Sequence, residues 1–257
     1  MPFTLSHPAA IIPFHRYVST YTSVAALVIG SMSPDFVYFL PLGVKGPFSH
    51  SLQGLFLFCL PAGLFVYVLF YLLLRQPLHA LMPQAIASRL TPQPEWRPRS
   101  LPKLFLIACS VVIGAATHIG WDAFTHAGSP VVRSSEILRY MVGPVGGLTM
   151  PVYKLLQHWS TLAGLGIIVA CLLRWMRRTP RMPYAHVRAS AVVRNWFYAG
   201  VVLAGCAGAG AAMMRPSKSL EHLLFNIVVT GMTCTALFIL AFCVWWQVGL
   251  RRNFVKG

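Results

Sequence analysis

Long apolar runs, separated by shorter polar segments, cover most of this chain. Five of the runs come close to the roughly 20 residues that an α-helix needs to cross the hydrocarbon core of a bilayer. They occupy residues 52–74, 103–126, 155–175, 196–214 and 223–248. The pattern therefore predicts five transmembrane helices.

A sixth apolar segment, 17–32, is shorter and follows the proline-broken piece HPAAIIPFHRY. It either crosses the membrane or forms a re-entrant hairpin with residues 7–16, and the pattern leaves both arrangements open. The predicted fold class is all-α: a polytopic membrane helix bundle with about five to six transmembrane segments.

The composition agrees with this prediction. Hydrophobic residues make up 56% of the 257 residues and charged residues only 10%, whereas a soluble domain of this length needs far more charge to cover its surface. The formal net charge of +16 would also suit a nucleic-acid-binding protein. However, the basic residues lie in the gaps between the apolar runs, as membrane topology requires. We therefore expect the lipid bilayer as a partner and no nucleic acid.

The distribution of Lys and Arg predicts an orientation. The gaps 75–103 and 174–194, together with the C-terminal tail, hold 14 of these residues, and the opposite segments 31–51, 127–154 and 215–222 hold six. Because short cytoplasmic loops are enriched in Lys and Arg, we expect the C-terminus to be cytoplasmic and the three opposite segments to face outward.

Candidate chemistry first appears in the stretch THIGWDAFTH, which places His118, Asp122 and His126 at steps of four. On a helix such steps form one stripe that runs ~12 Å inward from the outer end of the span. A charged residue inside a membrane is costly and usually has a partner in the protein interior. His and carboxylate are also preferred ligands of Zn²⁺ and similar ions.

Three further polar residues converge on the same membrane face. Asp35 follows the short apolar segment, His50 opens the first clear run, and His158 stands at the outer start of the third. Asp35 and Asp122 are the two aspartates of the whole chain, so chance clustering explains their placement poorly. The pattern favours a metal site over a structural His–Asp hydrogen-bond network, which remains the alternative.

The six cysteines do not contribute to this site. All lie within apolar runs and none forms a CxxC pair. We therefore expect them to act as small buried hydrophobic residues and not as zinc ligands or disulfides.

Five short pieces in order resemble an uncharacterised family of bacterial integral membrane proteins that carries a domain of unknown function. They are SHPAA (6–10), VIGSMSPDFVYF (28–39), SHSLQGLFLFCLP (49–61), THIGWDAFTH (117–126) and YKLLQHWST (153–161). The resemblance covers roughly residues 1–175. That family in turn is distantly similar to the metal-dependent hydrolases of bacterial inner membranes and, more weakly, to zinc-dependent phospholipases C.

The resemblance implies a set of metal ligands. His7, Asp35, His50, His118 and Asp122 match the ligand positions of the hydrolases, whereas His126 and His158 belong to the pattern of the nearer family. The hydrolases usually carry a second acidic residue after the Pro-Asp element. Here Val37 and Tyr38 follow Phe36, so the number of metal ions stays open.

These observations lead to one main functional hypothesis. Residues 1–175 would form a motif-bearing membrane domain with a metal site, and residues 176–257 a C-terminal pair of transmembrane helices. We expect a divalent metal such as Zn²⁺, which would serve hydrolysis of a phospholipid or another phosphoester at the outer face of a bacterial inner membrane. An ion-binding transporter and a non-catalytic membrane protein with a structural His–Asp network are the alternatives.

Overall fold

The chain is built almost entirely from helices. The computed structural model describes residues 3–12, 23–39, 43–90, 100–145, 148–182 and 188–255. Within these residues the β-structure is one short antiparallel hairpin, in which β1 (Met141–Val145) pairs with β2 (Leu148–Pro151). The predicted helical fold class is confirmed, and the hairpin is an addition that the apolar pattern did not indicate.

Five helical segments are long and apolar enough to cross a membrane, as predicted. They are Leu52–Leu81, Leu101–Ser134, Val152–Arg178, Ala191–Met213 and Leu220–Gly249. Large apolar side chains remain exposed on them, for example Leu57 at 71% and Phe105 at 73%. Exposing so much apolar surface to water costs about 25 cal/mol per Å². These faces are therefore suited to lipid, and the chain is a multi-pass membrane protein.

The sixth apolar segment is short in the described residues. There α2 (Val24–Met32) continues directly into the 3₁₀-helix η2 (Ser33–Tyr38), and the two together fall below spanning length. Another 3₁₀-helix, η1 (Thr4–Ile11), precedes them. Residues 13–22 lie outside the described part of the chain, and so does the choice between a complete span and a hairpin with residues 7–16.

The helices group into two compact units. The first comprises Met1–Tyr67 and Arg97–Arg177, and the second comprises Val68–Trp96 and Arg178–Gly257. Besides η1, α2, η2 and the β-hairpin, the first unit contains α3 (Gly46–Ser49), α4 (Leu52–Gly54), η3 (Leu55–Cys59), most of α5 (Leu60–Leu69), α8 (Leu101–Thr125), α9 (Pro130–Ser134), α10 (Glu136–Arg139) and α11 (Val152–Arg178). The second contains η4 (Phe70–Leu74), α6 (Arg75–Leu81), α7 (Gln84–Ala87), α12 (Ala191–Met213) and α13 (Leu220–Val255).

In the first unit, α2 and α8 cross at a contact that requires glycine on both helices. A Cβ atom on Gly30 would lie 2.3 Å from the backbone oxygen of Val111, and one on Gly114 would lie 2.3 Å from that of Leu27. The backbones therefore touch directly. Because His118 follows Gly114 by one helical turn, this close crossing brings it to the C-terminal end of α2.

The turn between α3 and α4 is held against the end of the π-helix η3 (Leu55–Cys59). Cys59 donates a hydrogen bond of 3.2 Å from its Sγ to the carbonyl oxygen of Ser49, and Ser51 caps α4 by accepting from the backbone N–H of Gly54 at 3.0 Å. A buried apolar cluster lies beside this turn and consists of Phe36, Val37, Leu55, Phe58, Cys59 and Ala115. His50, at the end of α3, is thereby fixed relative to η2 and α8.

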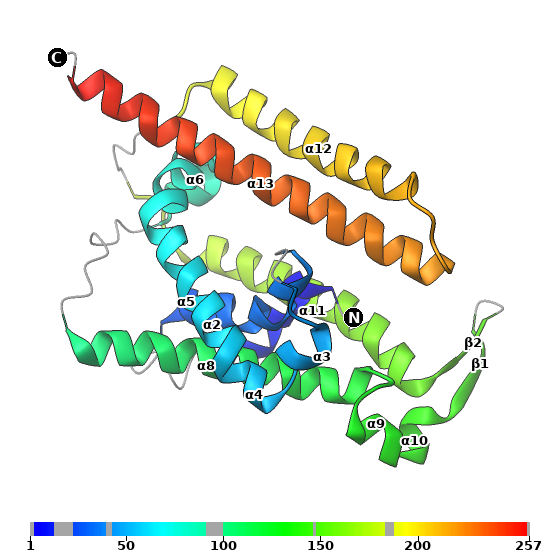
Figure 1. Cartoon of the computed structure of the whole chain (residues 1–257). Helices are drawn as coiled ribbons and strands as arrows, with labels where there is room; N and C mark the ends of the chain where they lie inside the picture. The colour runs from blue at the N-terminus through cyan, green and yellow to red at the C-terminus, as the bar shows by residue number, and fades with distance from the viewer. Residues whose placement is uncertain are drawn as a thin grey trace. The chain divides into compact units, whose positions relative to one another are not determined.

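In the second unit, α12 and α13 run side by side as a helical hairpin (Figure 1). Gly208 permits their close approach, because a Cβ there would lie 2.6 Å from the carbonyl oxygen of Thr230. Tyr198 of α12 donates a hydrogen bond of 2.6 Å to the carbonyl oxygen of Leu81 at the end of α6. The predicted C-terminal pair of helices thus forms part of a unit that also includes residues 68–96.

Candidate metal centre

Two neighbouring turns of α8 supply the centre of a buried polar cluster. His118 is fully buried and Asp122 is 4% exposed. The Nε2 atom of His118 lies 3.3 Å from Oδ2 of Asp122, as the predicted i, i+4 stripe requires. The helix then ends at Thr125, and His126 adopts an extended backbone conformation.

Two residues from other elements complete one side of the cluster. Asp35 lies in η2, directly after Pro34 in the first turn of the 3₁₀-helix, and its side chain is fully buried. Its Oδ1 atom lies 3.5 Å from Nε2 of His50 and 3.6 Å from Nε2 of His118. The same Nε2 atom of His50 lies 3.4 Å from Oδ2 of Asp122. Two histidines and two aspartates therefore face one another across a single small space.

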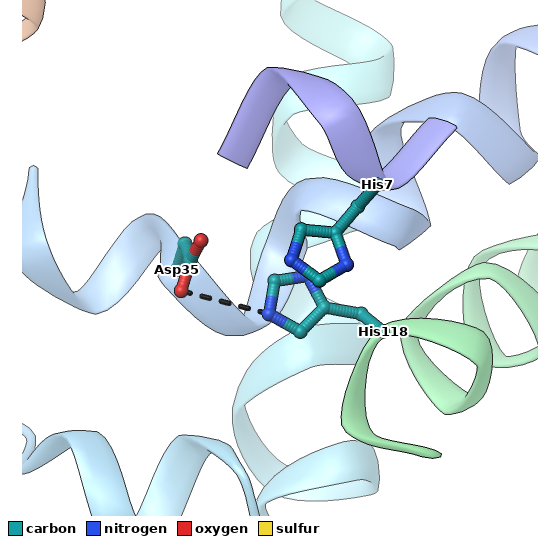
Figure 2. A group of neighbouring side chains, drawn as sticks. All are labelled: His7, Asp35 and His118. Carbon is teal, nitrogen blue, oxygen red and sulfur yellow. Dashed lines mark ion pairs between the residues drawn. The ribbon is translucent and has the colours of Figure 1, made fainter. Parts of the chain in front are cut away.

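His7 reaches the cluster from η1. Its ring stacks on that of His118, with centroids 3.5 Å apart and an angle of 13° between the planes. Its Nε2 atom lies 3.7 Å from Oδ1 of Asp122. Figure 2 shows the two rings face to face, with Asp35 beside them and joined to His118 by the marked ion pair.

Hydrogen bonds from the surrounding backbone orient the ligating groups. Nδ1 of His118 lies 2.7 Å from the carbonyl oxygen of Ser31. Nδ1 of His50 lies 3.0 Å from the carbonyl oxygen of Gly46. A carbonyl oxygen can only accept a hydrogen bond, so Nδ1 of each ring carries the hydrogen. When either ring is neutral, its lone pair is therefore on Nε2. Thr4 donates a hydrogen bond of 2.6 Å to Oδ2 of Asp35, which leaves Oδ1 free. Metal-binding sites commonly use such outer hydrogen bonds to fix their ligands.

The polar atoms at the centre of the cluster have no hydrogen-bond partner. Among the described residues, six buried side-chain atoms of the cluster lack a hydrogen-bond partner. They are Nε2 of His7, His50 and His118, Oδ1 of Asp35, and both carboxylate oxygens of Asp122. Buried polar atoms are normally paired, because leaving one unsatisfied costs about 1–3 kcal/mol. Six such atoms turned toward one space are suited to a bound cation.

The donor set fits a divalent metal ion. Two groups of three residues have donor atoms within 4.8 Å of one another: His7, Asp35 and His118, and His50, His118 and Asp122. Imidazole nitrogen with carboxylate oxygen is a ligand set that Zn²⁺ and related ions accept. The cluster could therefore hold a metal ion.

The ring of His7 is neutral, whereas His50 is charged when no metal is bound. Burial lowers the pKa of His7 to about 3, and the nearby His118 acts in the same direction. Burial also lowers the pKa of His50, but its contacts with Asp122 and Asp35 outweigh burial and raise the value to about 10. A proton on His50 thus lies between two carboxylates, where a metal ion would replace it.

The two remaining predicted residues lie at different distances from the cluster. The side chain of His126 is 32% exposed, and its Nδ1 lies 3.6 Å from Oδ2 of Asp122 and 3.1 Å from the Asp122 carbonyl oxygen. It therefore borders the cluster on an accessible side. His158 is exposed on α11 and belongs to neither group of three.

Two threonines support the site through contacts that the sequence pattern did not indicate. Thr4, which orients Asp35, is a single hydroxyl residue outside any motif. The piece YKLLQHWST contributes Thr161, whose Oγ1 accepts a hydrogen bond of 3.1 Å from the backbone N–H of Phe3. One turn further along α11, Gly164 lies against the backbone of Ser6. This face of α11 holds η1, and with it His7, in place.

Comparison with known protein families matches most of the chain to one family. The model of the domain of unknown function DUF4184 matches residues 1–244, and so includes α12 and most of α13 beyond the region that the five short pieces cover. No curated protein and no solved structure gives a significant match. The chain, a helical membrane protein with a buried His–Asp cluster, therefore belongs to the DUF4184 family.

Proposed function

We propose that this protein is a membrane-embedded, metal-dependent hydrolase that uses the His–Asp cluster to bind a divalent cation, with Zn²⁺ the best candidate. The observation that carries the proposal is the group of six buried, unpartnered nitrogen and oxygen atoms. It agrees with the resemblance of the sequence to metal-dependent membrane hydrolases, whose ligand positions match His7, Asp35, His50, His118 and Asp122.

The spacing of the cluster favours a metal site over a structural network. Charge-assisted hydrogen bonds between imidazole and carboxylate have donor–acceptor distances of about 2.7–2.9 Å. Here the five closest Nε2–carboxylate distances range from 3.3 to 3.7 Å. Groups that served only to join helices would close to hydrogen-bonding distance, whereas ligands of one ion stay separated by the ion.

Hydrolysis requires access to the cluster, and two histidines provide it. A divalent ion held there would supply Lewis acidity and a water whose pKa is lowered to about 7. His50 is 18% exposed and His126 is 32% exposed, whereas His7, His118 and Asp35 are closed off. Nδ1 of His126 donates to the Asp122 carbonyl oxygen, which leaves its Nε2 free to accept a proton on the accessible side.

The segment that follows α8 is suited to a lipid phosphoester. It exposes the apolar side chains Ile137 at 77% and Tyr140 at 69%, together with Arg133 and Arg139. Apolar and basic side chains side by side are typical of a surface at the bilayer interface, where Arg attracts anionic headgroups. Because this segment leaves the end of α8 that carries Asp122 and His126, we propose a phospholipid or a related phosphoester as the substrate.

The experiment is a hydrolysis assay on detergent-purified protein. We expect the zinc-loaded protein to release a phosphorylated headgroup or diacylglycerol from mixed micelles of phosphatidylcholine and phosphatidylglycerol. Chelation should abolish the activity, added Zn²⁺ should restore it, and His118→Gln should stay inactive under both conditions. A protein that binds metal but hydrolyses neither these lipids nor small phosphodiesters would contradict the hydrolase proposal while leaving the metal site intact.

A further inference from the structure

We infer that the phenol hydroxyl of Tyr38 donates a hydrogen bond to a phosphoryl oxygen of the substrate held at the metal centre. Tyr38 is the last residue of η2, and its side chain is partly buried. The inference rests on the metal-dependent hydrolysis proposed above and adds a residue that would contact the substrate there. The match to a domain of unknown function assigns no role to this side chain.

Tyr38 lies beside His50, at the accessible edge of the cluster. The centroids of the two rings are 6.5 Å apart, and their planes form an angle of 48°. On the same cluster, the ring of His126 also lies 6.5 Å from that of His50. His50 is 18% exposed and His126 is 32% exposed. These three partly exposed rings border the cluster where a substrate would approach the ion.

The hydroxyl of Tyr38 packs on Gly46. A Cβ atom on Gly46 would lie 2.5 Å from the hydroxyl oxygen of Tyr38 and 3.2 Å from its Cζ atom. Gly46 does not have a positive φ, so the phenol, and not the backbone conformation, requires glycine here. The carbonyl oxygen of Gly46 also accepts the hydrogen bond of 3.0 Å from Nδ1 of His50. The same residue therefore fixes the hydroxyl and the imidazole relative to each other.

The hydroxyl keeps its hydrogen in this position. An ordinary phenol has a pKa of about 10 and is protonated at neutral pH. Burial, and then the nearby carboxylates of Asp35 and Asp122, raise the pKa of Tyr38 to about 12. The hydrogen can rotate about the C–O bond toward an anion at the centre of the cluster. Tyr38 is therefore a hydrogen-bond donor at the edge of the metal centre.

A donor at this edge suits the hydrolysis of a phosphoester. Negative charge on the phosphoryl oxygens must be stabilised in the transition state, and donors that are already in place do this well. His126 has Nε2 available as an acceptor, because its Nδ1 donates to the carbonyl oxygen of Asp122. Tyr38 supplies the complementary donor and keeps its proton throughout.

The first test measures phosphate binding and not turnover. Inorganic phosphate is titrated into the Co²⁺-loaded protein, and the change in the visible cobalt spectrum gives the dissociation constant. Tyr38→Phe should hold as much metal as the wild type and bind phosphate about tenfold more weakly, as expected for a hydrogen bond to a charged group. Tyr198→Phe is the matched control, because its hydroxyl donates to the Leu81 carbonyl oxygen in the second unit. It should bind phosphate as the wild type does.

Three outcomes would overturn the inference. The first is an unchanged phosphate affinity in Tyr38→Phe, and the second is a wild type that holds Co²⁺ but binds no phosphate. The third is weaker metal binding by Tyr38→Phe in a chelator competition, with unchanged phosphate affinity of the loaded protein. That result would mean that Tyr38 only packs the turn that holds His50. A wild type that binds no metal would overturn the metal site and the inference together.

The second test uses the micelle assay described above. The kcat of Tyr38→Phe should fall about 100-fold, as when one preorganised donor is removed from an active site, with a smaller change in KM. A kcat equal to that of the wild type would contradict a donor role in the transition state. A wild type that binds metal and phosphate but hydrolyses nothing would contradict the hydrolase proposal, and the phosphate affinity of Tyr38→Phe would still decide the role of Tyr38.

Discussion

At the residue scale, three of the proposed ligands, His118, His50 and Asp35, each have a hydrogen-bond partner that leaves one side-chain atom free. The backbone carbonyls of Ser31 and Gly46 hold the Nδ1 sides of His118 and His50, and Thr4 holds one oxygen of Asp35. A metal ion gains affinity from such fixed donors because fewer side-chain conformations are lost on binding. The partners should therefore matter for the metal without touching it.

Thr4→Val tests this role directly. The substitution conserves shape but removes the donor to Oδ2 of Asp35, so we expect metal affinity to fall by about tenfold or more while the protein stays folded. Chelator competition measures the change. Thr233→Val in α13 is a matched control, because its hydroxyl donates to the carbonyl oxygen of Val229 in its own helix. Equal affinities in both variants would contradict the role of Thr4.

The charge of His50 predicts how metal binding depends on pH. The pKa of His50 in the metal-free protein is raised to about 10, so its proton must leave before Nε2 can bind an ion. Below that pKa, affinity should rise with pH by up to about tenfold per unit, because each unit lowers the proton concentration tenfold. Titrations with Zn²⁺ at about pH 6, 7 and 8 measure the slope. An affinity that does not change over this range would contradict the prediction.

At the element scale, the crossing of α2 and α8 determines whether the ligands meet. Gly30 and Gly114 let the backbones touch, and this contact places the carbonyl oxygen of Ser31 against His118. Because η2 continues directly from α2, the same crossing also sets the distance between Asp35 and the stripe on α8.

Gly30→Ala should disturb both the fold and the site. The added Cβ would lie 2.3 Å from the Val111 backbone oxygen, so we expect a loss of roughly 1–3 kcal/mol in stability and weaker metal binding. Gly120→Ala on α8 is the control, since nothing lies within 4 Å of its Cβ position. Alanine favours a helix by up to about 1 kcal/mol over glycine. Thermal unfolding in detergent measures both, and similar stability of the two variants would contradict the account of the crossing.

The sequence predicted the helices more completely than the site. Helix periodicity alone brings His118 and Asp122 together, and the long apolar runs correspond to the five spanning helices. His7 came from a family resemblance, because no periodic pattern relates η1 to α8. The support from Thr4 and Thr161 depends on contacts between distant segments. The β-hairpin and the grouping of residues 68–96 with the last two helices also arise from tertiary packing.

At the scale of the whole molecule, the proposed chemistry requires a defined side of the membrane. The counts of Lys and Arg favour a cytoplasmic position for 75–103, 174–194 and the C-terminus. The loop between α8 and α11, which begins beside the cluster, would then face outward. We propose that the site opens to the outer face of a bacterial inner membrane.

Reporter fusions test this orientation. An alkaline phosphatase fused after Glu136 in the loop between α8 and α11 should be active, and one fused after Arg188 should be inactive, because the enzyme folds only outside the cytoplasm. A fluorescent protein at the C-terminus should fluoresce. The reverse pattern would place the cluster on the cytoplasmic side and contradict an outer-leaflet substrate.

The central claim is that the buried His–Asp cluster binds a metal ion. The most direct measurement is the metal content of the detergent-purified protein by mass spectrometry, beside the double variant His118→Ala, Asp122→Ala. We predict a stoichiometric amount of zinc or a similar divalent ion in the wild type, and its loss from a variant that is still folded by size exclusion. A wild-type protein that binds no metal, even after incubation with Zn²⁺ and Mn²⁺, would contradict the account and favour a structural His–Asp network.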